Sequence, residues 1–296
     1  MNTPAARLSG AALPLQDKAP PQEQTAPAQR AHRASRARRL LPNREALVRF
    51  ALSWPFPLAV LLLWTLAAEF EWLPPQILPP PIMVAETFVE LVRSGELADN
   101  LWISLWRVLA GFAIGAGAGF ALGVAMGLSP RARDYLYPSF RLIAQVPSVG
   151  WLPLLMMLVG IGEALKIILI AKAAGMPIAM NTYKGLESVP TRFIEVARVY
   201  RFTRWQLLRR VVLPAAMPQI WNGIRYGLTH AWLALVAVEL LASSEGLGFL
   251  IVYGRQLYQL DVVMAAVVVV GAFGYALDKL LAVIEARLLR WRRDAF

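Results

Sequence analysis

The feature of this sequence that most constrains its fold is a series of long apolar segments separated by short polar connections. Six segments are long enough to cross a lipid bilayer as helices, which takes about 20 mainly apolar residues each; they cover residues 55–72, 101–128, 142–161, 164–182, 219–241 and 261–284. The whole chain is 57% hydrophobic and 17% charged, with a mean hydropathy of +0.50. This composition indicates lipid rather than water as the solvent. We therefore predict an all-α integral membrane protein with about six transmembrane helices.

Basic residues concentrate in alternate connections between these segments, and this predicts the orientation of the chain. The basic connections and the C-terminal segment contain Arg131, Arg133, Arg141, Lys184, Arg192, Arg198, Arg201, Arg204, Arg209, Arg210, Arg287, Arg290, Arg292 and Arg293. Connections rich in Lys and Arg stay in the cytoplasm, so both termini are predicted to be cytoplasmic. The connection 73–100 is then external, and its prolines precede a short helix predicted from Ile82 to Arg93.

The first 50 residues differ in composition from the rest. They are rich in Ala, Pro, Gln and Arg and lack any apolar core. We predict a disordered basic cytoplasmic tail at 1–50, followed by a transmembrane domain at 51–296. A mitochondrial transit peptide is also Arg-rich and acid-poor, and it is the alternative interpretation of this segment.

Composition also limits the chemistry and the partners. The chain has no cysteine, and its histidines are His32 and His230, so we predict no catalytic residues, no metal site and no cofactor. The sequence contains no GxxxxGK[ST] phosphate loop, so any ATP hydrolysis is expected in another subunit. Although the net charge is +11, the basic residues lie between apolar segments. The anionic inner leaflet of a bilayer, rather than nucleic acid, is therefore the predicted partner.

A glycine stripe marks the second apolar segment. Its members recur every four residues, at Gly111, Gly115, Gly119, Gly123 and Gly127. This spacing leaves one helix face without side chains, which predicts close packing against another helix. General tolerance of glycine in membrane helices is the alternative.

The connection at about 190–218 carries two amphipathic patterns. Phe193, Val196, Ala197 and Tyr200 share one face at helical spacing, and Trp205, Leu208 and Val212 share another. The pattern predicts two short helices that dock into a groove on a partner. A surface helix lying on anionic headgroups, favoured by Arg204, Arg209 and Arg210, is the alternative.

The same connection resembles the EAA loop of binding-protein-dependent ABC importer permeases. That signature reads Glu-Ala-Ala, three residues, Gly, nine residues, Ile, any residue, Leu-Pro. Glu195, Ala197, Leu213 and Pro214 match it and Val211 is a near match, whereas Val196 and Arg201 depart from it. The resemblance implies that Glu195, Val196, Ala197, Arg201, Leu213 and Pro214 couple the chain to an ATPase. Because arginine does not easily adopt the positive φ that glycine allows, the turn at Arg201 is in doubt.

The resemblance covers residues 55–292 and is strongest to the permeases for taurine, alkanesulfonates and nitrate. The segments that carry it include 77–81, 104–112, 160–167, 181–185, 231–233, 238–240 and 244–250. It implies a type I ABC importer permease fold in the bacterial inner membrane and a dimer of permease copies. It also implies a cytoplasmic ATP-binding cassette ATPase and a periplasmic or extracellular solute-binding protein. The expected solute is an alkanesulfonate or taurine, with nitrate or a related anion as the alternative.

Polar residues inside the apolar segments are candidates for the substrate path, because a charge in lipid is costly unless it faces a cavity or a partner. We select Lys172, His230 and Glu239. A structural ion pair between Lys172 and Glu239 is the alternative for those two residues. A further charged residue, Arg225, is expected to extend to the inner interface.

Two other classes of function remain open at this point. A secondary transporter or channel would move its solute without an ATPase. A membrane enzyme is disfavoured, because no nucleophile, metal cluster or paired carboxylates occur at useful spacing.

Overall fold

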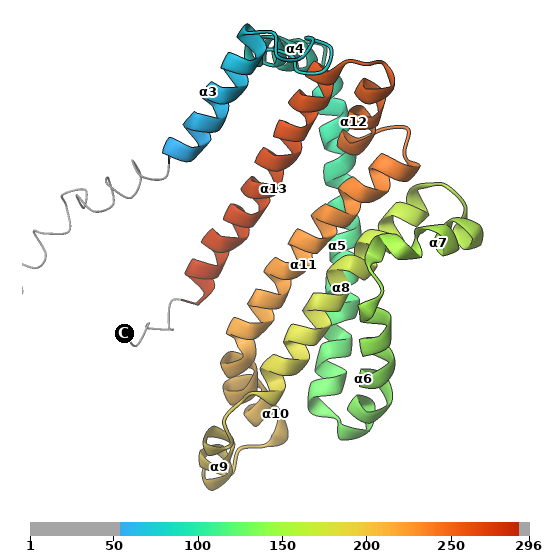
Figure 1. The fold of residues 1–296 in the computed structure, drawn as a ribbon. Coiled ribbons are helices and arrows are strands. Elements are labelled where there is room, and N and C mark those ends of the chain that lie inside the picture. The colour runs from blue at the N-terminus through green and yellow to red at the C-terminus, as the bar shows by residue number, and fades with distance from the viewer. Residues whose placement is uncertain (1–53, 290–296) are drawn as a thin grey trace, which may run out of the picture. The chain divides into compact units, whose positions relative to one another are not determined.

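The computed structural model describes residues 54–289, and every regular element among them is helical (Figure 1). The α-helices are α3 (Pro55–Glu69), α4 (Pro81–Arg93), α5 (Glu96–Leu128), α6 (Pro130–Gln145), α7 (Leu152–Val159), α8 (Glu163–Glu187), α9 (Thr191–Val199), α10 (Arg204–Leu207), α11 (Leu213–Ala242), α12 (Leu247–Gln256) and α13 (Leu260–Leu288). A 3-10 turn, η1 (Ser148–Trp151), precedes α7, and a π-helical turn, η2 (Leu208–Val212), joins α10 to α11. The contacts between residues divide the chain into two units, and the boundary lies within α3, between Leu63 and Trp64. The description below concerns the unit that begins at Trp64, and the tail predicted at 1–50 lies outside the described residues.

Most of the predicted helices are present. The segments 101–128, 164–182, 219–241 and 261–284 fall within α5, α8, α11 and α13, and the short helix predicted at 82–93 is α4. By length and apolarity, three helical stretches of the described chain can cross a membrane: Glu96–Leu128, Arg204–Gln256 and Leu260–Leu288. A bent pair would make a fourth, and α3 is a shorter apolar helix. The all-α membrane fold is confirmed. By this criterion the described residues contain three or four spans, and not the six that were predicted.

The span predicted at 142–161 is not one continuous helix. α6 ends at Gln145, and the chain turns by 94° before it continues through η1 into α7. The cause is Pro147, because proline lacks an N–H and keeps the preceding residue out of the helical region. Val146 accordingly adopts an extended conformation, with φ −82° and ψ 118°. Apolarity alone could not distinguish this broken pair from a continuous helix.

The glycines of α5 lie against α8. A Cβ atom added at Gly123 would lie 2.6 Å from the carbonyl oxygen of Ala179, and one added at Gly115 or Gly119 would overlap the backbone of α8 at Ala171 or Gly175. Gly111 and Gly127 similarly face the side chains of Ile170 and Leu186. Such contacts let two helix backbones approach closely, and they gain the van der Waals energy that holds membrane helices together.

A neighbouring face of α8 packs on α11, also with the help of glycine. A Cβ added at Gly227 would lie 2.7 Å from the side chain of Ile178, and one added at Gly223 would lie 2.7 Å from Cβ of Asn181. Asn181 accepts a hydrogen bond of 2.9 Å from Nε2 of Gln219. α8 therefore packs closely on both α5 and α11, which also contact each other.

A buried ion network joins four helices at the end of the bundle that carries α4 and α12. Its centre is Arg107 of α5, whose side chain is 1% exposed. Arg107 donates to Glu163 of α8 at 2.6 and 2.8 Å and to Glu239 of α11 at 3.0 Å. It also donates to the backbone carbonyl of Glu245, which precedes α12, at 2.8 Å. Lys166 completes the network with a 2.7 Å bond to Glu163.

The first turn of α12 depends on the same network. Its unpaired backbone N–H groups need acceptors, and side chains from α5 and α11 supply them. Gly246 N donates to Asn100 at 2.7 Å, Leu247 N to the Ser104 hydroxyl at 2.9 Å, and Gly248 N to Glu239 at 3.0 Å. The network thus fixes α12 to the long helices.

A tight turn separates α9 from α10, and Arg201 adopts the left-handed conformation there, with φ 52°. Phe202 N donates to the carbonyl of Ala197 at 3.0 Å, the long bond that closes a helix end of this kind. Thr203 then caps α10 through reciprocal bonds with Gln206. The turn doubted at the sequence level is therefore formed, with arginine in the conformation that glycine adopts more readily.

The glycine packing predicts opposite effects for two alanine substitutions in α5. Gly119→Ala should lower stability by about 1–3 kcal/mol, because its methyl group meets the backbone of α8. Gly117→Ala should be neutral or stabilising by up to about 1 kcal/mol, because a Cβ there meets no atom within 4 Å and alanine favours the helix. Melting temperatures of the two purified variants test this. An equal drop in melting temperature in both variants would contradict the close α5–α8 contact.

The turn at Arg201 predicts that Arg201→Gly stabilises the α9–α10 segment by about 1 kcal/mol, because glycine enters the left-handed region without steric cost. Arg201→Val should have the opposite effect, since a β-branched residue is disfavoured there. Rates of limited proteolysis within the segment provide the measurement. A faster rate for Arg201→Gly than for the native chain would rule out the proposed strain.

Candidate functional site

The first candidate site is the α9–α10 protrusion, residues 190–212, at the end of the bundle opposite α4 and α12 (Figure 1). Its exposed apolar side chains are Phe193, Val196, Val199, Tyr200 and Trp205, each between 45% and 80% exposed. Arginines 192, 198, 204, 209 and 210 of the same segment are also exposed. A surface that combines exposed apolar side chains with basic ones is suited to binding another macromolecule.

The structure places the sequence-selected residues of this segment in two different environments. Glu195, Val196, Arg201 and Pro214 are exposed, and Leu213 is partly buried. Ala197 is only 3% exposed, so in this chain its side chain lies inside the protrusion rather than on its surface. Its small size is needed inside the protrusion, where α9 packs on η2.

The base of the protrusion is tied to the bundle. Val212, predicted on the amphipathic face of the second helix, is buried in a cluster with Leu186, Val189, Ala216 and Ile220. Residues of α8, η2 and α11 thus share one hydrophobic core at this end. A force applied to the protrusion is therefore transmitted to the long helices rather than absorbed by a loose loop.

The second candidate site surrounds Lys172. Its ammonium Nζ donates to the carbonyl of Val146, at the bend after α6, at 2.8 Å, and lies 5.2 Å from the centre of the Trp151 ring. Lys172 also lines a cavity of about 210 Å³ between α5, α6 and α8, together with Gly115, Ala118 and Phe140. The alternative in which Lys172 pairs with Glu239 is wrong, because Glu239 belongs to the Arg107 network.

Two other sequence-selected residues lie away from this cavity. Glu239 is 1% exposed and its two oxygens accept from Arg107, Ser104 and Gly248. Within the described chain, these bonds join Glu239 to α5 and to the start of α12. His230 is exposed on α11, with Nδ1 2.9 Å from the carbonyl of Tyr226.

Arg225 does not simply extend to the interface. It binds Asp278 at 2.9 Å and Glu285 at 3.0 Å, both on α13. The three residues connect α11 to α13, and Arg225 and Asp278 border a second cavity of about 360 Å³. An arginine in a membrane helix thus finds its charge partners within the chain.

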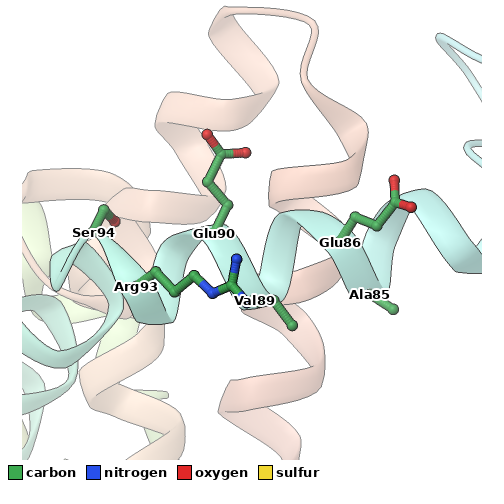
Figure 2. A pocket seen from close by; sticks show the side chains of 6 residues that line it. All are labelled: Ala85, Glu86, Val89, Glu90, Arg93 and Ser94. Carbon is green, nitrogen blue, oxygen red and sulfur yellow. The ribbon is translucent and has the colours of Figure 1, made fainter.

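A concave region of about 730 Å³ lies along α4 and is open (Figure 2). Its lining residues run from Ala85 within α4 to Ser94, which follows it, and include Glu86, Glu90 and Arg93. None of the sequence-selected site residues borders it. It is a surface groove on a short polar-faced helix rather than a cavity inside the bundle.

Sequence reasoning missed the centre of the ion network. Arg107 lies inside a predicted span, and a charge at such a position signals a partner or a cavity. Asp278, a charged residue inside the last predicted span, carries the same sign of a partner or a cavity. Within residues 54–289, no group of three His, Asp or Glu residues is arranged to hold a metal ion.

Comparison with known proteins gives consistent matches. Residues 113–290 match the family described as "Binding-protein-dependent transport system inner membrane component". The chain is 38% identical to the putative aliphatic sulfonates transport permease SsuC of Bacillus subtilis, over 80% of this chain and 86% of that protein. It is 37% identical to the taurine transport system permease TauC of Escherichia coli, over 80% of this chain and 88% of that protein. It is 32% identical to the nitrate import permease NrtB of a Synechocystis species, over 71% of this chain and 79% of that protein.

A solved structure supports the fold. One chain of the inward-facing MetNI methionine ABC transporter matches with a TM-score of 0.50 and 23% identity, over 63% of this chain and 93% of that chain. The predicted type I importer permease fold is thus confirmed. The match of residues 113–290 and the relatives above place this multi-pass chain in the family of binding-protein-dependent transport system inner membrane components.

Proposed function

We propose that this chain is the membrane subunit of an ATP-driven importer for small organic anions, with alkanesulfonate or taurine as the solute. The main support is its identity of 36–38% to permeases for aliphatic sulfonates and taurine. Nitrate or a related anion is the second candidate, supported by the more distant nitrate permease. Family membership argues against a secondary transporter.

In this proposal two copies of the chain enclose one central path. A cytoplasmic ATP-binding cassette ATPase binds each copy, and an external solute-binding protein delivers the anion. The chain has no phosphate loop of its own, so the energy of ATP must enter through a protein contact. Closure of the ATPases would then rotate the attached helices between outward-open and inward-open arrangements.

The α9–α10 protrusion is the proposed ATPase contact. Its apolar surface, with Val196 and Tyr200 exposed, is the kind of surface that a groove on a partner would cover. Glu195 lies on the same short helix and is exposed. Ala197 supports the contact indirectly, because its small side chain lets α9 pack on η2.

The proposed orientation follows from charge. The protrusion is rich in arginine, so it lies in the cytoplasm together with both termini. α4 and α12 then lie outside, where the exposed Glu86 and Glu90 of α4 would face the binding protein. In the alternative, the protrusion lies on anionic lipid headgroups instead of on the ATPase. That alternative predicts the same orientation of the chain.

A single cysteine tests the ATPase contact. Because the native chain has no cysteine, Glu195→Cys gives one thiol for a photoactivatable crosslinker. In a preparation that transports, we expect capture of the ATPase subunit. Capture of lipid alone would support headgroup binding and would sink the proposed contact.

Two matched variants control this experiment. Ala197→Cys lies two residues away but is buried, so its thiol should react far more slowly than the one at 195. Glu86→Cys should react with a membrane-impermeant maleimide added outside intact cells, whereas the thiol at 195 should not. Labelling of position 195 from outside would overturn the orientation.

A further inference from the structure

The cavity beside Lys172 combines an apolar wall with a single positive charge. Ala118 of α5, Phe140 of α6 and Met176 of α8 line it, and Lys172 is the one charged residue among its lining residues. Its volume, about 210 Å³, is below the range of about 300–1,000 Å³ for drug-sized ligands. A small ligand with an apolar part fits this description.

The ammonium group of Lys172 has capacity for a further acceptor. It carries three donors, and among residues 54–289 its hydrogen-bond partner is the Val146 carbonyl, with no carboxylate at ion-pair distance. Arg107, Lys166 and Arg225 of the long helices each have a carboxylate partner. Lys172 and Lys279 instead lie over aromatic rings, and of these two Lys172 lines the cavity. The charge of Lys172 is thus one that no carboxylate of the described chain compensates at ion-pair distance.

An uncompensated ammonium in a membrane helix requires an anion or water. An anionic oxygen accepts a stronger hydrogen bond than a neutral carbonyl does, so it can replace or join Val146 at Nζ. The Trp151 ring holds the ammonium from one side. These contacts leave room for a headgroup at Nζ and an apolar tail along the small side chains of α5.

We propose that this cavity is a binding site for the transported anion and selects an alkanesulfonate with an apolar tail. Nζ of Lys172 binds the sulfonate, and the apolar wall at Ala118, Phe140 and Met176 contacts the tail. The inference rests on the proposed anion import and narrows its solute. Taurine is disfavoured because its ammonium group meets no carboxylate in the lining, and nitrate because it has no apolar part.

Equilibrium binding to the purified permease–ATPase complex, without binding protein, tests this site. The probe is radiolabelled 1-butanesulfonate. The native complex should bind it at least about tenfold more tightly than taurine or nitrate, and Lys172→Met should weaken binding at least about tenfold. Lys172→Arg should retain most of the affinity, because the charge remains.

Two further variants separate this site from general effects. Lys279→Met removes a lysine on α13 that also lies over an aromatic ring, Tyr275, and should leave binding unchanged. Ala118→Phe fills the cavity and should weaken butanesulfonate binding more than methanesulfonate binding. If Lys172→Met fails to assemble, the chain-length selectivity of Ala118→Phe decides the question, and unchanged selectivity contradicts the site.

Parallel uptake measurements with the complete importer keep this inference separate from the proposed function. If the native importer takes up no sulfonate with ATP, the proposed solute class is wrong. If it takes up butanesulfonate while Lys172→Met binds and transports normally, only the cavity assignment is wrong. A phospholipid that copurifies with the native complex and is lost in Lys172→Met, with sulfonate binding unchanged, would also contradict the assignment.

Discussion

The close contact of α5 with α8 determines most of the geometry of this chain. In lipid, helices gain little from burying apolar surface against each other, so close packing must supply the attraction. Gly111, Gly115, Gly119 and Gly123 bring the two backbones together, and Gly223 and Gly227 do the same for α11. The position of α8 then fixes Lys172 on one side and the base of the α9–α10 protrusion at its end.

The two ends of the bundle are stabilised in different ways. At the end that carries α12, Arg107 and its carboxylate partners add an ion network to the apolar core. Loss of Arg107 would leave the buried Glu239 without a cation, which is far costlier than loss of the pair. At the opposite end, α10 and η2 are joined to the long helices by a hydrophobic cluster. A partner that moves the protrusion therefore acts on rigid helices rather than on a loop.

The sequence predicted the helices whose signal is local. The long apolar runs gave α5, α8, α11 and α13, and amphipathic spacing predicted the two short helices of the protrusion. The four-residue glycine spacing predicted a bare helix face, although not its partner α8. Resemblance of the motifs correctly indicated the family.

Features that depend on tertiary contacts were not predictable in this way. The bend after α6 results from Pro147, one proline within a mainly apolar run, and the apolarity of that run indicated a single helix. Ala197 has helical spacing with exposed residues, yet it packs inward because η2 folds back on α9. Glu239 and Lys172 looked like equivalent charges in spans. Only the fold shows that Arg107 compensates the first and that the second borders a cavity.

The central claim is that ATP hydrolysis by a partner subunit drives the import of a small anion through this chain. The most direct measurement is uptake of labelled 1-butanesulfonate by proteoliposomes that contain the permease, its ATPase and its binding protein. The account predicts uptake only when ATP is available to the ATPase and the binding protein lies on the other side of the membrane from the ATPase. It also predicts unchanged uptake after ionophores dissipate proton and sodium gradients. Uptake driven by an ion gradient without ATP would contradict the account.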